Sequence, residues 1–224
     1  LKTRHFTLYY KEMYYSNDEV RGIAARKERL LSRINLELGT AFDGRIETYL
    51  TAHGDATATL KGAVREPRWY VIDDNGHEIV HMVAERELGW SKNGFLREGL
   101  AEALELDLKY PDAIEEFVRH CTVLGYGDPA WYAAQPGIHD QIVDDASFDY
   151  RHFDYVRSGA FVRFLIDTYG VEKVKRFYRA SCTMIAYDLA YEFSCIFGRT
   201  VREEETRFES SHVRCVDCET ATIV

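Results

Sequence analysis

The chain has 224 residues, of which 46% are hydrophobic and 29% are charged, and a chain of this length can bury one sizeable core. Its 28 basic and 37 acidic residues give a net charge of −9, which opposes binding to phosphate backbones and to anionic lipid surfaces. We therefore expect no nucleic-acid partner, and because no apolar run approaches the roughly 20 residues that cross a bilayer, we expect no integral membrane segment.

The first third of the chain mixes strand and helix patterns. Several short runs place apolar side chains at every second position, which indicates strands, and one longer run keeps helical spacing until Gly39, a typical end of a helix. We therefore expect a small, mostly antiparallel sheet with helices in residues 1–72. The predicted elements are strands at residues 5–10, 45–51, 57–64 and 68–72, and a helix at residues 17–38.

After residue 72 almost every segment favours a helix. Residues 73–75 (Asp-Asp-Asn) are suitable N-caps for a helix that begins at His77 and ends at Gly89. A long loop is expected over residues 125–147. The chain is therefore predicted to be an α+β protein with a single domain, in which residues 73–224 form a mainly helical part. The further predicted helices cover residues 93–111, 111–124, 153–169, 171–179, 182–197 and 201–211.

The most informative stretch of the sequence is His77-Glu78-Ile79-Val80-His81, an H-E-x-x-H motif on a predicted helix. Two histidines four residues apart lie on the same face of a helix and can bind one zinc ion. The glutamate between them can accept a proton from a water that the zinc activates. Because H-E-x-x-H also occurs by chance in helices with two exposed histidines, the rest of the chain has to support this interpretation.

Support comes from the next predicted helix. Zinc takes about four ligands, and a catalytic zinc keeps one position open for water. Glu98 is expected to supply the third protein ligand after a chain reversal at residues 89–93. Glu102 lies one turn further on the same face, where it is either a hydrogen-bond partner that orients a bound histidine or a surface acid. Glu105 and Asp107 are expected to be surface acids.

The two segments resemble the gluzincins, zinc metallopeptidases in which a glutamate from a later helix joins H-E-x-x-H. Residues 95–102 (FLREGLAE) are similar to the Glu-Gly-hydrophobic-Ala segment of the peptidase MA-like group, and residues 158–170 are similar to its later helix beside the zinc site. The resemblance covers residues 57–178. It implies a zincin-like fold, a Zn²⁺ cofactor, a peptide or protein substrate and Glu78 as general base. It slightly favours an extracytoplasmic or secreted location.

The resemblance also implies an edge strand that holds the substrate. Gly62, Ala63 and Val64 are expected to form this edge and to bind the peptide by backbone hydrogen bonds. The same stretch lacks the Gly-x-Met-Glu-Asn pattern of the aminopeptidase relatives, which argues against aminopeptidase activity.

A third implication is a donor that stabilises the oxyanion of the tetrahedral intermediate. Tyr155 is the expected donor, by its place just before the Ser158-Gly159-Ala160 segment. Tyr150 and His152 are the alternatives.

Two other functions compete with a zinc peptidase. Glu78-x-x-His81 is also the metal-binding pair of di-iron carboxylate proteins, but these need a second Glu-x-x-His on another helix, and the sequence has none. A binding module that keeps the metallopeptidase fold without turnover is the other alternative, and the intact Glu78 argues against it. The sequence therefore favours a peptidase that uses a zinc-activated water.

Overall fold

A computed structural model describes residues 1–54, 56–59, 63–73, 76–109, 136–144, 147–148, 152–184 and 186–219. The chain divides into two compact units, Leu1–Trp90 and Ser91–Val224. The described residues are mostly helical and include one small sheet, so the expected α+β class is confirmed. The boundary follows Trp90, and the helix with the two histidines therefore belongs to the unit that holds the sheet.

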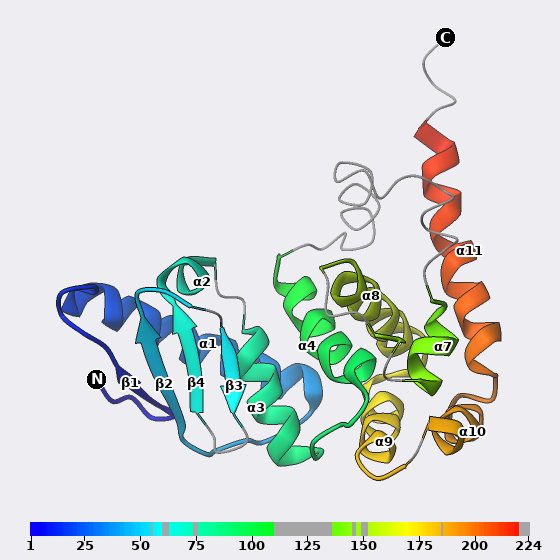
Figure 1. Ribbon diagram of the computed structural model, residues 1–224, viewed down its shortest axis with the longest axis horizontal. Coiled ribbons are helices and arrows are strands. Elements are labelled where there is room, and N and C mark those ends of the chain that lie inside the picture. Colours follow the sequence, from blue (N-terminus) through cyan, green and yellow to red (C-terminus); the bar gives the residue numbers. More distant parts are fainter. Residues whose placement is uncertain are drawn as a thin grey trace. The chain divides into compact units, whose positions relative to one another are not determined.

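The first unit contains the strands β1 (Phe6–Tyr9), β2 (Ile46–Thr51), β3 (Thr57–Thr59) and β4 (Ala63–Pro67), which form one sheet in the order β1-β2-β4-β3 (Figure 1). β1, β2 and β4 are parallel, and β3 runs antiparallel to β4. The prediction of a mostly antiparallel sheet is therefore wrong. Parallel neighbours need a long crossover connection, and helix α1 (Asn17–Leu38) provides one between β1 and β2.

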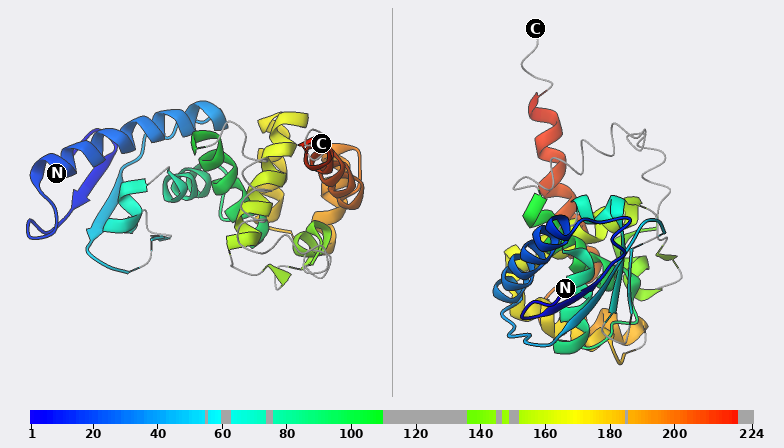
Figure 2. Two further views of the ribbon diagram at one scale, coloured as in Figure 1. Left: turned by 90° about the horizontal axis from the view of Figure 1, so that it is seen from above. Right: turned by 90° about the vertical axis from the view of Figure 1, so that its left-hand side faces the viewer.

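Helix α1 covers one face of this sheet (Figures 1 and 2). It begins with a capping box, in which the Ser16 hydroxyl accepts from the Glu19 amide and the Glu19 carboxylate accepts from the Ser16 amide. It ends, as predicted, at Gly39, which has a left-handed φ of 58°. The buried side chains of α1 and the strands form the core of the unit and include Phe6, Leu8, Val20, Ile23, Leu31, Ile34, Leu38, Ile46, Leu50 and Val64.

One ion pair lies inside this core. The Lys27 Nζ on α1 lies 2.6 Å from a carboxylate oxygen of Glu66 on β4, and the two side chains are 1% and 0% exposed. Lys27 follows the spacing of the apolar residues of α1, so it occupies a core position. The pair therefore joins α1 to β4 by charge.

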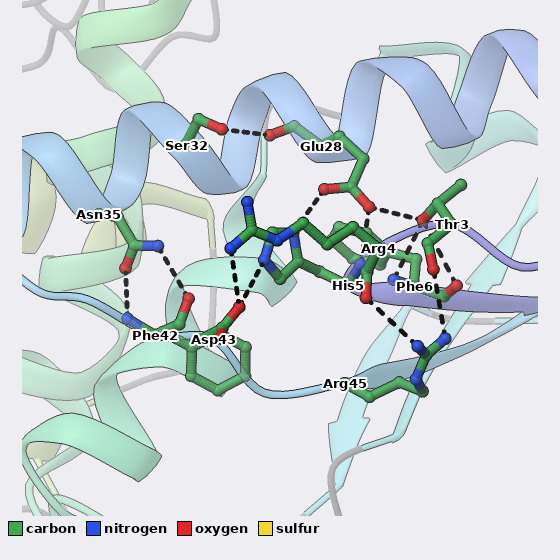
Figure 3. Close-up of polar contacts among 10 residues, drawn as sticks. All are labelled: Thr3, Arg4, His5, Phe6, Glu28, Ser32, Asn35, Phe42, Asp43 and Arg45. Carbon is green, nitrogen blue, oxygen red and sulfur yellow. Dashed lines mark hydrogen bonds and ion pairs between the residues drawn. The ribbon is translucent and has the colours of Figure 1, made fainter.

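A second group of charges ties the start of β1 to α1 and to the loop before β2 (Figure 3). The His5 Nδ1 lies 2.6 Å from a Glu28 carboxylate oxygen, and the His5 Nε2 lies 3.1 Å from an Asp43 oxygen. The Arg4 guanidinium contacts the same Asp43 oxygen at 3.2 Å. Carboxylate oxygens only accept hydrogen bonds, so Glu28 and Asp43 each offer an acceptor to the imidazole ring.

Residues 68–72, predicted to be a strand, belong instead to helix α2 (Arg68–Asp73). Pro67 ends β4 directly before it, and the fixed φ of proline suits the start of a helix. Val71 is buried while Trp69 is 60% exposed. The β-branched and aromatic residues of this stretch indicate a strand, but the stretch forms a helix because it directly follows Pro67. The strand predicted at residues 57–64 is divided between β3 and the start of β4.

The regular elements of the second unit, among its described residues, are helices. Phe161 lies at the centre of its core, with its ring centroid 6.0 Å from that of Phe95 and 5.5 Å from that of Phe208. The helices are α4 (Gly94–Lys109), α7 (Ile138–Val143), α8 (His152–Tyr169), α9 (Val171–Ser181), α10 (Ala186–Phe197) and α11 (Val201–Glu219).

Helix α7 falls within the loop predicted at residues 125–147, and that prediction is wrong for residues 138–143. The Glu205 carboxylate of α11 accepts from the amides of Ile138 and His139 at 2.6 and 3.3 Å and so caps the first turn of α7. Because the cap comes from a residue more than sixty positions away, the local sequence gives no sign of it. Most of the rest of this loop and the helix predicted at residues 111–124 lie outside the described residues.

Candidate metal centre

Helix α3 (His77–Glu87) carries both histidines of the motif in the first unit. Its N-cap is Gly76, with a φ of 95°, and not one of residues 73–75 as predicted. A Cβ at this position would lie 3.2 Å from Ile34 Cδ1 of α1. The helix therefore begins at a glycine because the backbone there is left-handed and lies close to α1.

The two imidazoles lie one turn apart on α3. Their Nε2 atoms are 3.1 Å apart, and the histidines are 8% and 9% exposed. Two nitrogens bound to one zinc ion at about 2.0–2.1 Å with a tetrahedral angle between them lie about 3.3 Å apart. The spacing of His77 and His81 is therefore close to the spacing that a tetrahedral zinc requires, and imidazole nitrogen is a suitable ligand type.

Glu78 lies between the two histidines, in the first turn of α3, and is 7% exposed. The positive end of the helix dipole at this turn favours a negatively charged side chain. A general base has to be ionised before it accepts a proton, so this position suits that role. The whole stretch from His77 to Ala84 is buried, which fixes the helix on which the three side chains stand.

In the second unit, α4 begins after Asn93, as predicted. The Asn93 Oδ1 accepts from the Leu96 amide at 3.0 Å, which is an N-cap contact. The Asn93 side chain also donates to the carbonyl oxygens of Gln141 and Ile142 at 3.2 and 3.3 Å. The first turn of α4 is therefore fixed against α7.

Two glycines bring α4 and α8 into close contact. A Cβ at Gly99 would lie 2.9 Å from the Ser158 carbonyl oxygen, and a Cβ at Gly159 would lie 2.4 Å from the Cβ of Glu102. Both values are too short for real atoms, so neither position can hold a larger residue at this helix spacing. The Glu-Gly and Ser-Gly-Ala segments of the sequence therefore meet each other, and this contact orients the helix that carries Glu98.

In the first unit His77 and His81 could hold a metal ion, and in the second unit α4 carries the carboxylates of Glu98, Glu102 and Glu105. Glu98 is 7% exposed, and Glu102 and Glu105 are half-buried. Imidazole nitrogens and carboxylate oxygens suit zinc and also several other divalent metals. Glu105 was expected to be only a surface acid. Its spacing places it on the same face of α4 as Glu98 and Glu102, because residues i, i+4 and i+7 share one face of a helix.

The residues predicted to bind substrate are placed differently from expectation. Ala63 and Val64 lie in β4, which pairs with β2 on one side and with β3 on the other. The prediction that they form an edge strand is therefore wrong, because their backbone groups face neighbouring strands on both sides. Of the described strands, β3 lies at this edge of the sheet. Gly62 lies outside the described residues.

Tyr155, the expected oxyanion donor, lies in the first half of α8 and is half-buried. Its ring centroid is 5.9 Å from that of Phe148, which in turn lies 6.3 Å from that of Phe95. The ring therefore packs at the margin of the aromatic core of the second unit. Of the alternatives, His152 begins α8, and Tyr150 lies outside the described residues.

No protein-family model matches the chain, and no curated protein matches it either. No helix among the described residues is long and apolar enough to span a membrane. The resemblance to gluzincins therefore rests on the motif residues of the sequence.

Proposed function

We propose that the protein is a zinc-dependent peptidase with a gluzincin-like catalytic core. The observation that carries this proposal is the pair of buried imidazoles on α3, with Nε2 atoms 3.1 Å apart and a buried glutamate between them in sequence. His77 and His81 would hold the zinc, and Glu98 of the second unit would complete the protein ligands. Zinc bound there would polarise the scissile carbonyl and make water acidic enough to be deprotonated near neutral pH.

Glu78 is the proposed general base. Its carboxylate takes a proton from the attacking water and later gives it to the nitrogen of the leaving amine. Tyr155 is the proposed donor to the oxyanion, and Glu102 the proposed partner that orients a histidine ligand. Burial keeps the base away from bulk water, which strengthens its interactions with the reacting atoms.

Strand β3 is the proposed support for the peptide substrate. It lies at the edge of the described sheet and contacts α3 within the first unit. An extended peptide that adds to this edge would be held by backbone hydrogen bonds. These bonds depend little on the side chains of the peptide. Its scissile bond would then run beside the helix that carries the base and two ligands.

The test is the variant Glu78→Gln. The amide keeps the volume of the side chain but cannot accept the proton, so peptide hydrolysis should fall by about 100- to 10,000-fold while zinc content is unchanged. Glu85→Gln is the matched control, because Glu85 lies on the same helix and is half-buried. This control should keep full activity.

The measurements are metal content by elemental analysis and cleavage of a peptide library with and without a chelator. Hydrolysis that survives in Glu78→Gln would exclude the proposed base. Zinc binding together with an absence of any cleavage by the wild-type chain would favour the binding module instead. A chain that binds no divalent metal would rule out the proposed zinc peptidase.

A further inference from the structure

Arg97 precedes the proposed metal ligand Glu98 and contacts its carboxylate. The Arg97 Nε lies 3.0 Å from the Glu98 Oε1, and the two side chains are 14% and 9% exposed. Adjacent residues of a helix do not face each other, so a contact between positions i and i+1 is not a default of helix geometry. A second contact, toward the N-terminal end of α4, holds the arginine side chain in this orientation.

The partner in this second contact is the carbonyl of Ser91, just before α4. The Arg97 Nη1 donates to it at 3.3 Å. Ser91 is fully buried, and its hydroxyl oxygen lies 2.6 Å from that of Ser181 on α9. The Asn93 amide donates to the same Ser91 hydroxyl oxygen at 3.2 Å, and the Ser181 hydroxyl donates to the Tyr178 carbonyl at 2.6 Å. The backbone that anchors Arg97 is therefore itself held by buried hydrogen bonds to α9.

A buried carboxylate is costly unless a positive group or a metal compensates its charge. The guanidinium of Arg97 supplies that compensation within the second unit. A carboxylate has two oxygens and about four lone pairs, so it can accept from an arginine and still bind a cation. The contact with Arg97 is therefore compatible with a metal on the same carboxylate.

We propose that Arg97 is a positioning residue, which orients the Glu98 carboxylate for the metal and balances its charge in the metal-free protein. This inference rests on the proposed function, in which Glu98 is a metal ligand. Removal of hydrogen-bond partners of metal ligands typically weakens metal binding by about 10- to 100-fold. Arg97 should have an effect of this size although it is not itself a ligand.

The first test uses the metal-free full chain. Arg97→Gln, Glu98→Gln and the double variant are compared by their midpoints of thermal unfolding. The double variant should lose less than the sum of the single losses, because the two residues act as a pair. Arg163→Gln is the matched control, since Arg163 pairs with Asp167 at 2.9 Å on α8. The losses in unfolding midpoint caused by Arg163→Gln and Glu98→Gln should add in their double variant. If the losses caused by Arg97→Gln and Glu98→Gln also add, Arg97 and Glu98 do not act as a pair.

The second test measures zinc affinity by competition with a chromophoric chelator. Arg97→Gln should weaken binding about 10- to 100-fold, and Arg97→Lys, which keeps the charge but not the planar guanidinium, should weaken it less. The visible spectrum of the cobalt-substituted protein should also change in Arg97→Gln, which a purely structural role would not cause. Arg163→Gln should leave both readouts unchanged.

The outcomes separate this inference from the proposed function. Zinc affinity that is equal in wild type and Arg97→Gln would overturn the positioning role and leave the peptidase proposal intact. A wild-type chain that binds no zinc, with coupling still present in the first test, would refute the metal ligand role of Glu98. Arg97 and Glu98 would then be an ordinary buried ion pair. If Arg97→Gln does not fold, Arg97→Lys carries the comparison.

Discussion

The two units hold their candidate metal ligands by different physical means. In Leu1–Trp90 the histidines stand on a helix that is buried along most of its length, in a core that also encloses the Lys27–Glu66 ion pair. In Ser91–Val224 the carboxylates stand on a helix that is fixed by close backbone contact with α8, at Gly99 and Gly159. The first unit therefore depends on charge balance in its core, and the second depends on small volume at a helix crossing.

This difference predicts which substitutions each unit tolerates. Loss of one charge should damage the first unit severely, because the remaining charge would be buried without its partner. Addition of one methyl group should damage the second unit, because close-packed helices can accept it only by moving apart. Either change should alter a ligand-bearing helix through the contacts that support it within its own unit.

The largest effect is expected for Lys27→Met in the first unit. Loss of one partner of a buried ion pair costs about 3–5 kcal/mol in free energy of unfolding, because Glu66 would remain charged in the core or be forced to take up a proton. The double variant with Glu66→Leu should recover most of that loss, since it removes both charges. Urea denaturation of the three chains measures this, and a single variant as stable as wild type would contradict the importance of charge balance here.

A smaller effect is expected for Gly159→Ala in the second unit. The new Cβ would lie 2.4 Å from the Cβ of Glu102, so α4 and α8 must separate, at a cost of about 1–3 kcal/mol. This cost opposes the gain of up to about 1 kcal/mol that alanine brings to a helix, so the net effect should be destabilising. Zinc affinity should fall as well, because Glu98 moves with α4.

Gly22→Ala is the matched control for this substitution. Gly22 lies within α1, and a Cβ there would meet no atom within 4 Å. The substitution should therefore stabilise the chain by about 0.5–1 kcal/mol through helix propensity alone. Thermal unfolding of both variants checks the pair, and equal shifts would show that the α4–α8 contact has room for a methyl group.

Local signals in the sequence predicted the limits of α1 and the start of α4. The end of α1 follows from Gly39, which closes the helix with a left-handed backbone. Asn93 marks the start of α4 in the same way, through a contact three residues away. The placement of H-E-x-x-H on one buried helix also follows from local spacing, because i and i+4 share a helix face.

Features that depend on distant residues were not predictable in this way. Alternation of apolar residues is the same in parallel and antiparallel strands, so the sequence could not reveal that β4 lies between β2 and β3. Trp69 and Val71 favour a strand, yet they lie in α2. Arg97 was missed because its role depends on an anchor at Ser91, which is itself held by Ser181 some ninety residues later.

The smallest effect is expected for the partly exposed group of charges around His5, in the same unit as the buried pair. Burial raises the pKa of Glu28, but hydrogen bonds from the Thr3 hydroxyl and from the His5 amide and ring outweigh it, so this pKa lies below its ordinary value of 4.5. The His5 ring and Arg4 hold the pKa of Asp43 below 3.8. Carboxyls with lowered pKa values stabilise the folded chain above their ordinary pKa, and the stabilisation is lost as the pH falls through the folded pKa.

The variant His5→Asn should therefore differ from wild type in a pH-dependent way. The charged groups that face the ring are Glu28 from α1, Asp43 from the following loop and Arg4 from its own segment, with the last two exposed to solvent. The loss in unfolding midpoint should be present at about pH 5–6 and should shrink below about pH 4, as both carboxyls take up protons. Salt should reduce it, unlike the effect of Lys27→Met, because solvent screens exposed charges far more than buried ones. A difference that stays constant across this pH range would mean that His5 acts by packing, and that charge balance in this unit is confined to its core.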